Sequence, residues 1–106
     1  MYEFKKKIFS KFEGKCAYCG NEITIDNMTV DHIRPKSKGG SLSTFNCYPA
    51  CSRCNTLKGD GTVEDLRNKI KYSLNQLKKS KEYQIARKYK LVSSLDEEVV
   101  FYFEKV

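Results

Sequence analysis

The 106-residue sequence predicts a small α+β domain, and three features of the chain lead to this expectation. Apolar residues recur at helical spacing in two segments, residues 2–13 and residues 62–79. Between them, residues 16–61 are rich in turn-forming residues and cysteines. Because a chain of this length rarely holds two independent cores, residues 1–106 are expected to form a single domain.

The first helical segment has one apolar face and a clear end. Its apolar face is made of Phe4, Ile8, Phe9 and Phe12. Gly14 follows as a stop signal, so residues 2–13 are expected to form a short amphipathic helix. Beyond it, only residues 22–25 and 29–33 have strand character in the cysteine-rich middle of the chain.

The second helical segment begins with Thr62 and Asp65, which have the spacing of a capping box. Apolar residues then repeat at helical spacing as Val63, Leu66, Ile70, Leu74 and Leu77. A further turn of helix is expected within residues 82–89. Residues 99–103 have strong β propensity and are expected to form a terminal strand, which completes a C-terminal extension over residues 62–106.

Composition and charge narrow the classes of partner. Twenty basic and 13 acidic side chains give a formal net charge of +7, which suits a polyanion such as DNA, although surface lysines are often only solvated charge. The longest apolar run, residues 99–103, is too short to span a bilayer, and the N-terminus lacks a secretory signal. A cytoplasmic location with reduced cysteines and no membrane partner is therefore expected.

Two Cys-x-x-Cys pairs, Cys16 with Cys19 and Cys51 with Cys54, are separated by 31 residues. Each pair can present two sulfurs to one tetrahedral Zn²⁺, so a structural zinc site is predicted. Disulfides are disfavoured by a reducing compartment, and a redox motif would not explain two pairs. Zinc contributes about 10 kcal/mol to the folding of small zinc domains. The fifth cysteine, Cys47, is expected to be a small buried apolar residue.

A second group of residues lies between the two cysteine pairs and extends through the second pair. Residues 30–40 read VDHIRPKSKGG, Asn46 follows, and residues 51–58 read CSRCNTLK. This core motif, residues 16–58, resembles the HNH endonuclease family. The resemblance implies a ββα-metal, treble-clef-like fold, in which a strand, a loop and a helix starting near the second cysteine pair surround one catalytic ion. The chain has Asn55 where the family often has His.

The resemblance also implies roles for four residues. Asp31 and Asn55 would bind one Mg²⁺ or Mn²⁺, His32 would be the general base, and Asn46 would orient the active-site loop. Oxygen ligands suit these hard ions, and a free imidazole is largely neutral at physiological pH. The implied reaction is hydrolysis of DNA phosphodiester bonds to 5′-phosphate and 3′-hydroxyl ends. Because successive strand residues face opposite ways, Asp31 and His32 would need a twisted or bulged backbone to share one site.

The sequence also allows other interpretations of these residues. An Asp-His pair is often a turn or a satisfied core histidine, but His32 is the sole histidine and lies between the cysteine pairs. Gly39 and Gly40 most simply supply a flexible turn, with phosphate contact as the lesser alternative. The candidate DNA-binding residues, each of which is otherwise a solvated charge, are Arg34, Lys36, Lys38, Arg53 and Lys58.

The main rival to a nuclease is a catalytically silent zinc module that binds DNA or protein. A module of that kind has no reason to keep Asp31, His32, Asn46 and Asn55 together. No small-molecule substrate is expected. Sequence preference, nicking versus double-strand cutting, oligomeric state and a role in phage, mobile-element or defence biology are left open by the sequence.

Overall fold

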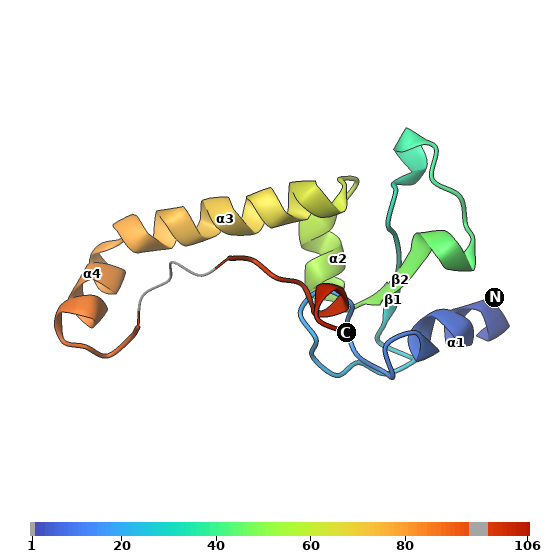
Figure 1. The fold of residues 1–106 in the computed structure, drawn as a ribbon, viewed down its shortest axis with the longest axis horizontal. Coiled ribbons are helices and arrows are strands. Elements are labelled where there is room, and N and C mark those ends of the chain that lie inside the picture. The colour runs from blue at the N-terminus through green and yellow to red at the C-terminus, as the bar shows by residue number, and fades with distance from the viewer. Residues whose placement is uncertain (1, 94–97) are drawn as a thin grey trace. The chain divides into compact units, whose positions relative to one another are not determined.

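The computed structural model describes residues 2–93 and 98–106, and it divides into two compact units. The first unit comprises Met1–Leu66 with Val100–Val106, and the second comprises Arg67–Val99. Whether the chain acts as one domain therefore stays a prediction. The elements, labelled in Figure 1, are α1 (Tyr2–Ser10), β1 (Thr29–His32), η1 (Lys36–Lys38), η2 (Thr44–Asn46), β2 (Cys47–Ala50), α2 (Ser52–Lys58), α3 (Val63–Lys79), α4 (Lys81–Lys88) and η3 (Tyr102–Glu104).

Strands β1 and β2 form an antiparallel pair, and α2 follows β2 directly (Figure 1). The register runs one to one from Thr29 opposite Ala50 to His32 opposite Cys47, with no bulge between them. Cys51 is the N-cap of α2, and its Sγ accepts a hydrogen bond from the Cys54 backbone N–H at 3.4 Å. This strand–strand–helix arrangement confirms the predicted α+β, ββα-type fold.

The core of the first unit lies between α1, the first cysteine pair and the strand pair. Ile8 of α1 is fully buried, as are Cys16, Cys47 and Ala50. Helix α1 ends at Ser10, three residues before the predicted end, and the following turn brings the Gly14 N–H to the carbonyl of Phe9 at 3.3 Å. Gly14 has a φ of +80°, which explains the glycine at the predicted stop.

Both predicted helices of the extension are present. The capping box of α3 is reciprocal, because the Thr62 N–H donates to Asp65 Oδ2 at 2.8 Å and the Asp65 N–H donates to Thr62 Oγ1 at 3.1 Å. Helix α4 starts after Ser80, whose hydroxyl oxygen accepts from the Tyr83 N–H at 3.1 Å. Within the described residues, no helix combines the length and apolar character that crossing a bilayer requires.

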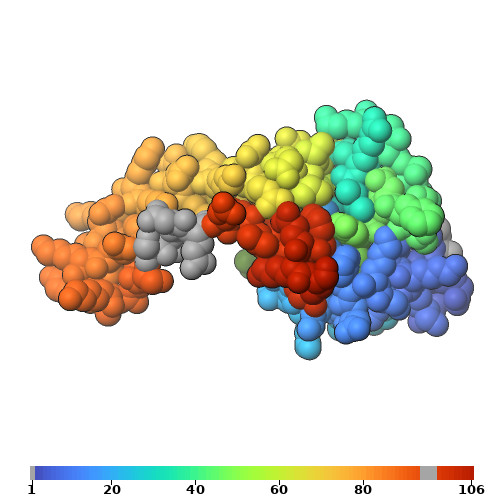
Figure 2. All heavy atoms as spheres, viewed as in Figure 1, coloured from blue at the N-terminus to red at the C-terminus, as the bar shows by residue number. Residues whose placement is uncertain are grey.

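The predicted terminal strand is wrong. Residues 98–101 have no regular secondary structure, and Tyr102–Glu104 forms the short 3₁₀ helix η3. The N–H groups of Tyr102 and Phe103 donate to the carbonyls of Tyr18 and Ala17 at 3.0 and 2.8 Å, and Phe101 is buried. Phe101 and Phe103 thus pack on Tyr18, within the turn of the first cysteine pair, rather than on a strand partner, and Figure 2 shows this red segment beside the blue N-terminal residues.

Residues 22–25 also differ from expectation. They form only an isolated antiparallel bridge between Lys15 and Glu22. The Ile23 N–H donates to the Gly14 carbonyl at 2.9 Å, and Ile23 is buried, so this segment closes a loop rather than adding a strand to the sheet.

Candidate metal sites and active site

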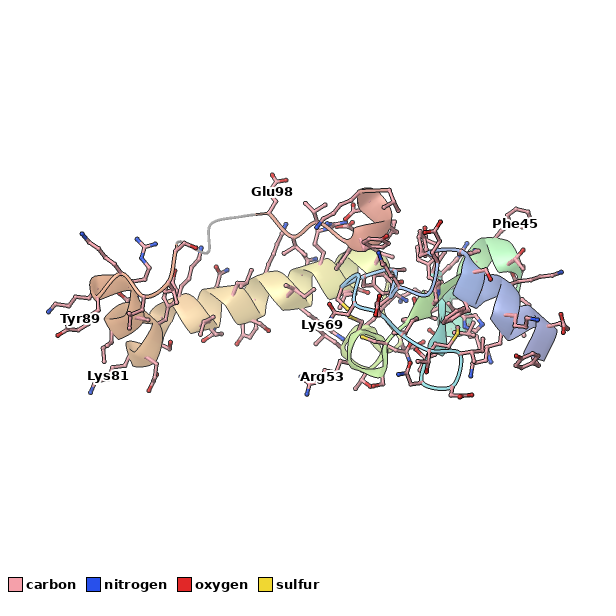
Figure 3. All side chains as sticks on the ribbon, turned by 90° about the horizontal axis from the view of Figure 1, so that it is seen from below. Phe45, Arg53, Lys69, Lys81, Tyr89 and Glu98 are labelled. Atoms are coloured by element: carbon pink, nitrogen blue, oxygen red, sulfur yellow. The ribbon has the colours of Figure 1, made fainter. Side chains whose placement is uncertain are left out.

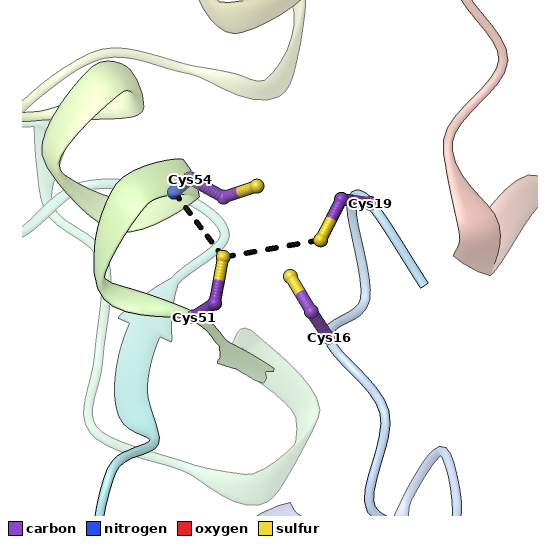
Figure 4. A group of neighbouring side chains, drawn as sticks. All are labelled: Cys16, Cys19, Cys51 and Cys54. Atoms are coloured by element: carbon purple, nitrogen blue, oxygen red, sulfur yellow. Dashed lines mark hydrogen bonds between the residues drawn. The ribbon is translucent and has the colours of Figure 1, made fainter. Parts of the chain in front are cut away.

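The four paired cysteines meet at one place in the first unit (Figure 4). Their Sγ atoms all lie within 4.8 Å of one another, and Cys19 Sγ is 3.9 Å from Cys51 Sγ. In a tetrahedral site with Zn–S bonds of about 2.3 Å, sulfurs are about 3.8 Å apart. The predicted cysteines are therefore brought together at a spacing that fits one Zn²⁺.

Each cysteine pair is held by a different local structure. The first pair lies on a turn closed by a hydrogen bond from the Gly20 N–H to the Cys16 carbonyl at 3.0 Å. Gly20 has a φ of +77°, and a Cβ there would lie 2.9 Å from the Tyr102 ring, so both the turn and the packing require glycine. The second pair begins α2, as described above.

The chemistry of the cluster favours metal binding over disulfides. All five cysteines are free, and the 3.9 Å between Cys19 and Cys51 is far longer than a disulfide of about 2.05 Å. A hydrogen bond from Cys54 lowers the pKa of the Cys16 thiol to about 4, and the same contact raises the pKa of Cys54. One sulfur of the cluster thus favours the thiolate, which is the form that binds metals.

A second site lies in a hollow of about 170 Å³ between β1 and α2. We call it the β1–α2 hollow, and it is lined by Val30, Asp31, His32, Pro35, Lys36, Asn55, Gly59 and Asp60. Three of the four residues predicted for catalysis, Asp31, His32 and Asn55, share this hollow. Asp60 was missed by the sequence prediction, although its position between two glycines directly after α2 was a usable signal of an exposed acidic turn.

Asp31 and His32 share the hollow, and of the twisted or bulged backbone expected there, the register of β1 with β2 contains no bulge. His32 is the last residue of β1 and is half-buried, and beyond it the Ile33 N–H donates to the Asn46 carbonyl at 2.8 Å. Within the described part of the chain, His32 Nε2 is buried and has no hydrogen-bond partner. Because nearly all buried polar atoms in proteins are paired, an unpaired ring nitrogen in a residue that lines the hollow marks His32 as a candidate functional group.

Asp31 is 3% exposed and is held by two donors. The Tyr18 hydroxyl donates to Oδ2 at 2.5 Å, and the Lys58 ammonium donates to Oδ1 at 3.2 Å. Burial, reinforced by the charge of Asp31, raises the pKa of Tyr18, so its hydroxyl stays protonated as a donor. A carboxylate offers about four lone-pair positions, so each oxygen retains room for a further partner.

Lys58 was predicted to contact DNA, but its side chain lies inside the protein. Its side chain is completely buried, and its ammonium also donates to the His32 carbonyl at 2.8 Å. As the last residue of α2, Lys58 extends inward beneath the strand that carries Asp31, which leaves no exposed surface for a phosphate. The other four predicted DNA-binding residues are exposed, and Figure 3 shows Arg53 extending outward from α2.

Asn46 lies outside the β1–α2 hollow and organises the loop beside it. Its Oδ1 accepts from the Arg34 N–H at 2.9 Å, and its Nδ2 donates to the carbonyls of Arg34 and Ser41 at 3.1 and 2.8 Å. A Cβ on Gly40 would lie 1.7 Å from the Arg34 carbonyl oxygen. Glycine is thus required at position 40 because the backbone there lies close to the backbone of Arg34. This corrects the expectation that Gly40 serves only to make the turn flexible.

Comparison with known proteins agrees with this geometry. Residues 16–61 match the model of the HNH endonuclease family. It is similar to the CRISPR-associated endonuclease Cas9 of Corynebacterium diphtheriae, with 47% identity over 47 residues. That match covers 43% of this chain and 4% of the Cas9 chain.

A solved structure shows the same fold. The crystal structure of the Type II-C Cas9 enzyme from Actinomyces naeslundii matches with a TM-score of 0.58 and 19% sequence identity. The match covers 84% of this chain and 12% of that chain. This chain therefore spans only a small part of the length of both relatives.

Proposed function

We propose that this chain is a DNA endonuclease that uses one divalent metal ion and has the β1–α2 hollow as its active site. The observation that carries the proposal is the convergence of Asp31, His32 and Asn55 on that hollow, with His32 Nε2 buried and without a partner in the described part of the chain. The family match over residues 16–61 and the endonuclease named among the relatives support it.

His32 would act as the general base. A water molecule that enters the β1–α2 hollow can donate its proton to Nε2 while it attacks the phosphorus of a phosphodiester. The expected products carry a 5′-phosphate and a 3′-hydroxyl. The hydrogen bonds of Asn46 to Arg34 and Ser41 would keep the neighbouring loop in place during this step.

Asp31 and Asn55 would hold the catalytic ion. Their carboxylate and amide oxygens form a donor set that suits Mg²⁺ or Mn²⁺, and both residues line the same hollow as His32. When bound, such an ion supplies charge neutralisation at the scissile phosphate and the leaving oxygen. Asp60 lines the hollow as a further carboxylate near this pair.

The cysteine cluster would hold a structural Zn²⁺. The four sulfurs tie the turn at Cys16–Cys19 to the start of α2, so the ion would fix the helix that carries Asn55. Four thiolate ligands leave no open position for a substrate, which separates this ion from the catalytic one.

DNA is the proposed substrate, and its binding would be mainly electrostatic. Arg34, Lys36, Lys38 and Arg53 are exposed, and Lys36 lines the β1–α2 hollow itself. Contacts of basic side chains with phosphates position a protein on DNA without reading its sequence. Weak sequence preference is therefore expected.

The proposal is tested by incubating supercoiled plasmid with the protein and Mg²⁺, Mn²⁺ or EDTA. Conversion to nicked or linear plasmid with either metal, and its absence with EDTA, is the expected result. Metal-loaded, folded protein that binds the plasmid without cutting it would instead support the catalytically silent zinc module.

A further inference from the structure

We infer that Tyr18 is a positioning residue that links the cysteine cluster to the catalytic carboxylate, an inference that rests on the function proposed above. Tyr18 lies between Cys16 and Cys19 in the first cysteine pair. Its hydroxyl donates to Asp31 Oδ2 at 2.5 Å. The backbone of Tyr18 is thus part of the turn that carries the first cysteine pair, while its hydroxyl contacts a residue of the proposed active site.

The backbone of Tyr18 is fixed on both sides. The Ala17 N–H donates to the Pro49 carbonyl at 2.9 Å, which joins the turn to β2. The Tyr18 carbonyl accepts from the Tyr102 N–H at 3.0 Å. With Cys16 and Cys19 bound to one ion, the position of the Tyr18 ring would follow from the geometry of the metal site.

The ring of Tyr18 is enclosed by other aromatic side chains. Its centroid lies 5.4 Å from that of Phe101, 6.0 Å from Phe103 and 6.2 Å from Tyr48, with the rings near perpendicular in each pair. Such edge-to-face contacts define the direction in which the hydroxyl points. Phe101 and Phe103 lie outside the segment that matches the family model, so the C-terminal residues complete this support.

The hydroxyl determines how the carboxylate of Asp31 is presented. Without it, the Lys58 contact at Oδ1 is what the described residues would still offer the Asp31 carboxylate, which could then rotate toward that ammonium. The Asp31 carboxylate would then no longer be held in the orientation in which it binds a metal ion. Loss of an outer partner of a metal ligand typically lowers metal affinity by about 10 to 100-fold.

Tyr18→Phe tests this inference because it removes the hydroxyl and keeps the ring. Tyr48→Phe is the matched control, since it removes a hydroxyl from the same aromatic group, opposite Asp31 in the sheet register. Three quantities are measured on the zinc-loaded full chain: zinc content, the thermal transition, and Mn²⁺ binding without DNA, followed by the electron paramagnetic resonance signal of free Mn²⁺. Asp31→Ala identifies the Mn²⁺ that belongs to the active site.

The expected result is that Tyr18→Phe keeps its zinc and thermal transition but binds Mn²⁺ about 10 to 100-fold more weakly, whereas Tyr48→Phe behaves as wild type. In plasmid cleavage, the half-saturating Mn²⁺ concentration should rise by the same factor, with much of the rate restored at saturation. Wild-type Mn²⁺ affinity in Tyr18→Phe would overturn the inference, and so would loss of zinc, which would show a role in folding. Wild-type protein that binds Mn²⁺ through Asp31 but never cuts would instead contradict the proposed function.

Discussion

The ammonium of Lys58 lies 3.2 Å from Oδ1 of Asp31, and both side chains are buried. Water therefore screens this ion pair little. Removing one partner of a buried pair leaves the other charge uncompensated, which is more costly than the loss of the attraction itself.

Lys58→Met is accordingly predicted to destabilise the protein by about 3–5 kcal/mol, because Asp31 would remain buried without its ammonium partner. Chemical denaturation of the zinc-loaded protein measures this change. Lys38→Met is the control, since Lys38 is exposed and should change the free energy of unfolding by less than about 0.5 kcal/mol. Adding Asp31→Asn to Lys58→Met should recover part of the loss, and strict additivity of the two changes would argue against the pair.

The two classes of cysteine should respond differently to substitution. Cys51→Ser removes one of four clustered sulfurs and should cost metal and fold together, because zinc supplies on the order of 10 kcal/mol to small zinc domains. Cys47→Ser should be milder, since Cys47 is buried outside the cluster and loses only a small apolar contact. Metal analysis after dialysis and thermal unfolding check both variants. Zinc and a normal thermal transition retained in Cys51→Ser would contradict the assignment.

DNA affinity should fall steeply with salt. On duplex DNA, log K declines by about 0.9 per log unit of salt for each phosphate contact. Arg53 is exposed on α2, so Arg53→Ala should remove one phosphate contact. The slope of log K against log salt should then become shallower by about 0.9. Fluorescence anisotropy at several salt concentrations measures the slope. A shallow slope combined with strong preference for one DNA sequence would refute electrostatic binding.

Asn46→Ala should lower the cleavage rate while sparing zinc. The substitution removes the hydrogen bonds that hold residues 34 and 41, each worth about 0.5–1.5 kcal/mol, and so loosens the loop beside the hollow. Cleavage rate and zinc content are measured in parallel on the same preparation. A cleavage rate equal to that of wild type would show that the loop needs no such support.

The sequence predicted those parts of the site that depend on local spacing. A short motif is enough to place an element that is encoded within a few residues. This holds for the two cysteine pairs, the strand with Asp31 and His32, and the helix with Asn55. The contact of Tyr18 with Asp31 joins two such segments, and nothing in the spacing indicates which tyrosine will meet the carboxylate.

The DNA contact predicted for Lys58 and the predicted terminal strand are both wrong for the same physical reason. Lys58 looks like any basic residue on a short helix, and its burial follows only from the packing of α2 on β1. The β propensity of residues 99–103 expresses a fit to an apolar surface, and residues 101–103 find that surface on Tyr18 rather than on a neighbouring strand. Tertiary contacts decided both outcomes.

The role of His32 is tested most directly by single-turnover plasmid cleavage with His32→Ala at saturating Mn²⁺, with zinc content, thermal transition and DNA affinity measured on the same protein. General-base catalysis is worth about 10² to 10⁴-fold, so the cleavage rate should fall by at least that range while the other three quantities stay at wild-type values. A folded, zinc-loaded, DNA-binding His32→Ala protein that still cuts at the wild-type rate would contradict the proposed mechanism.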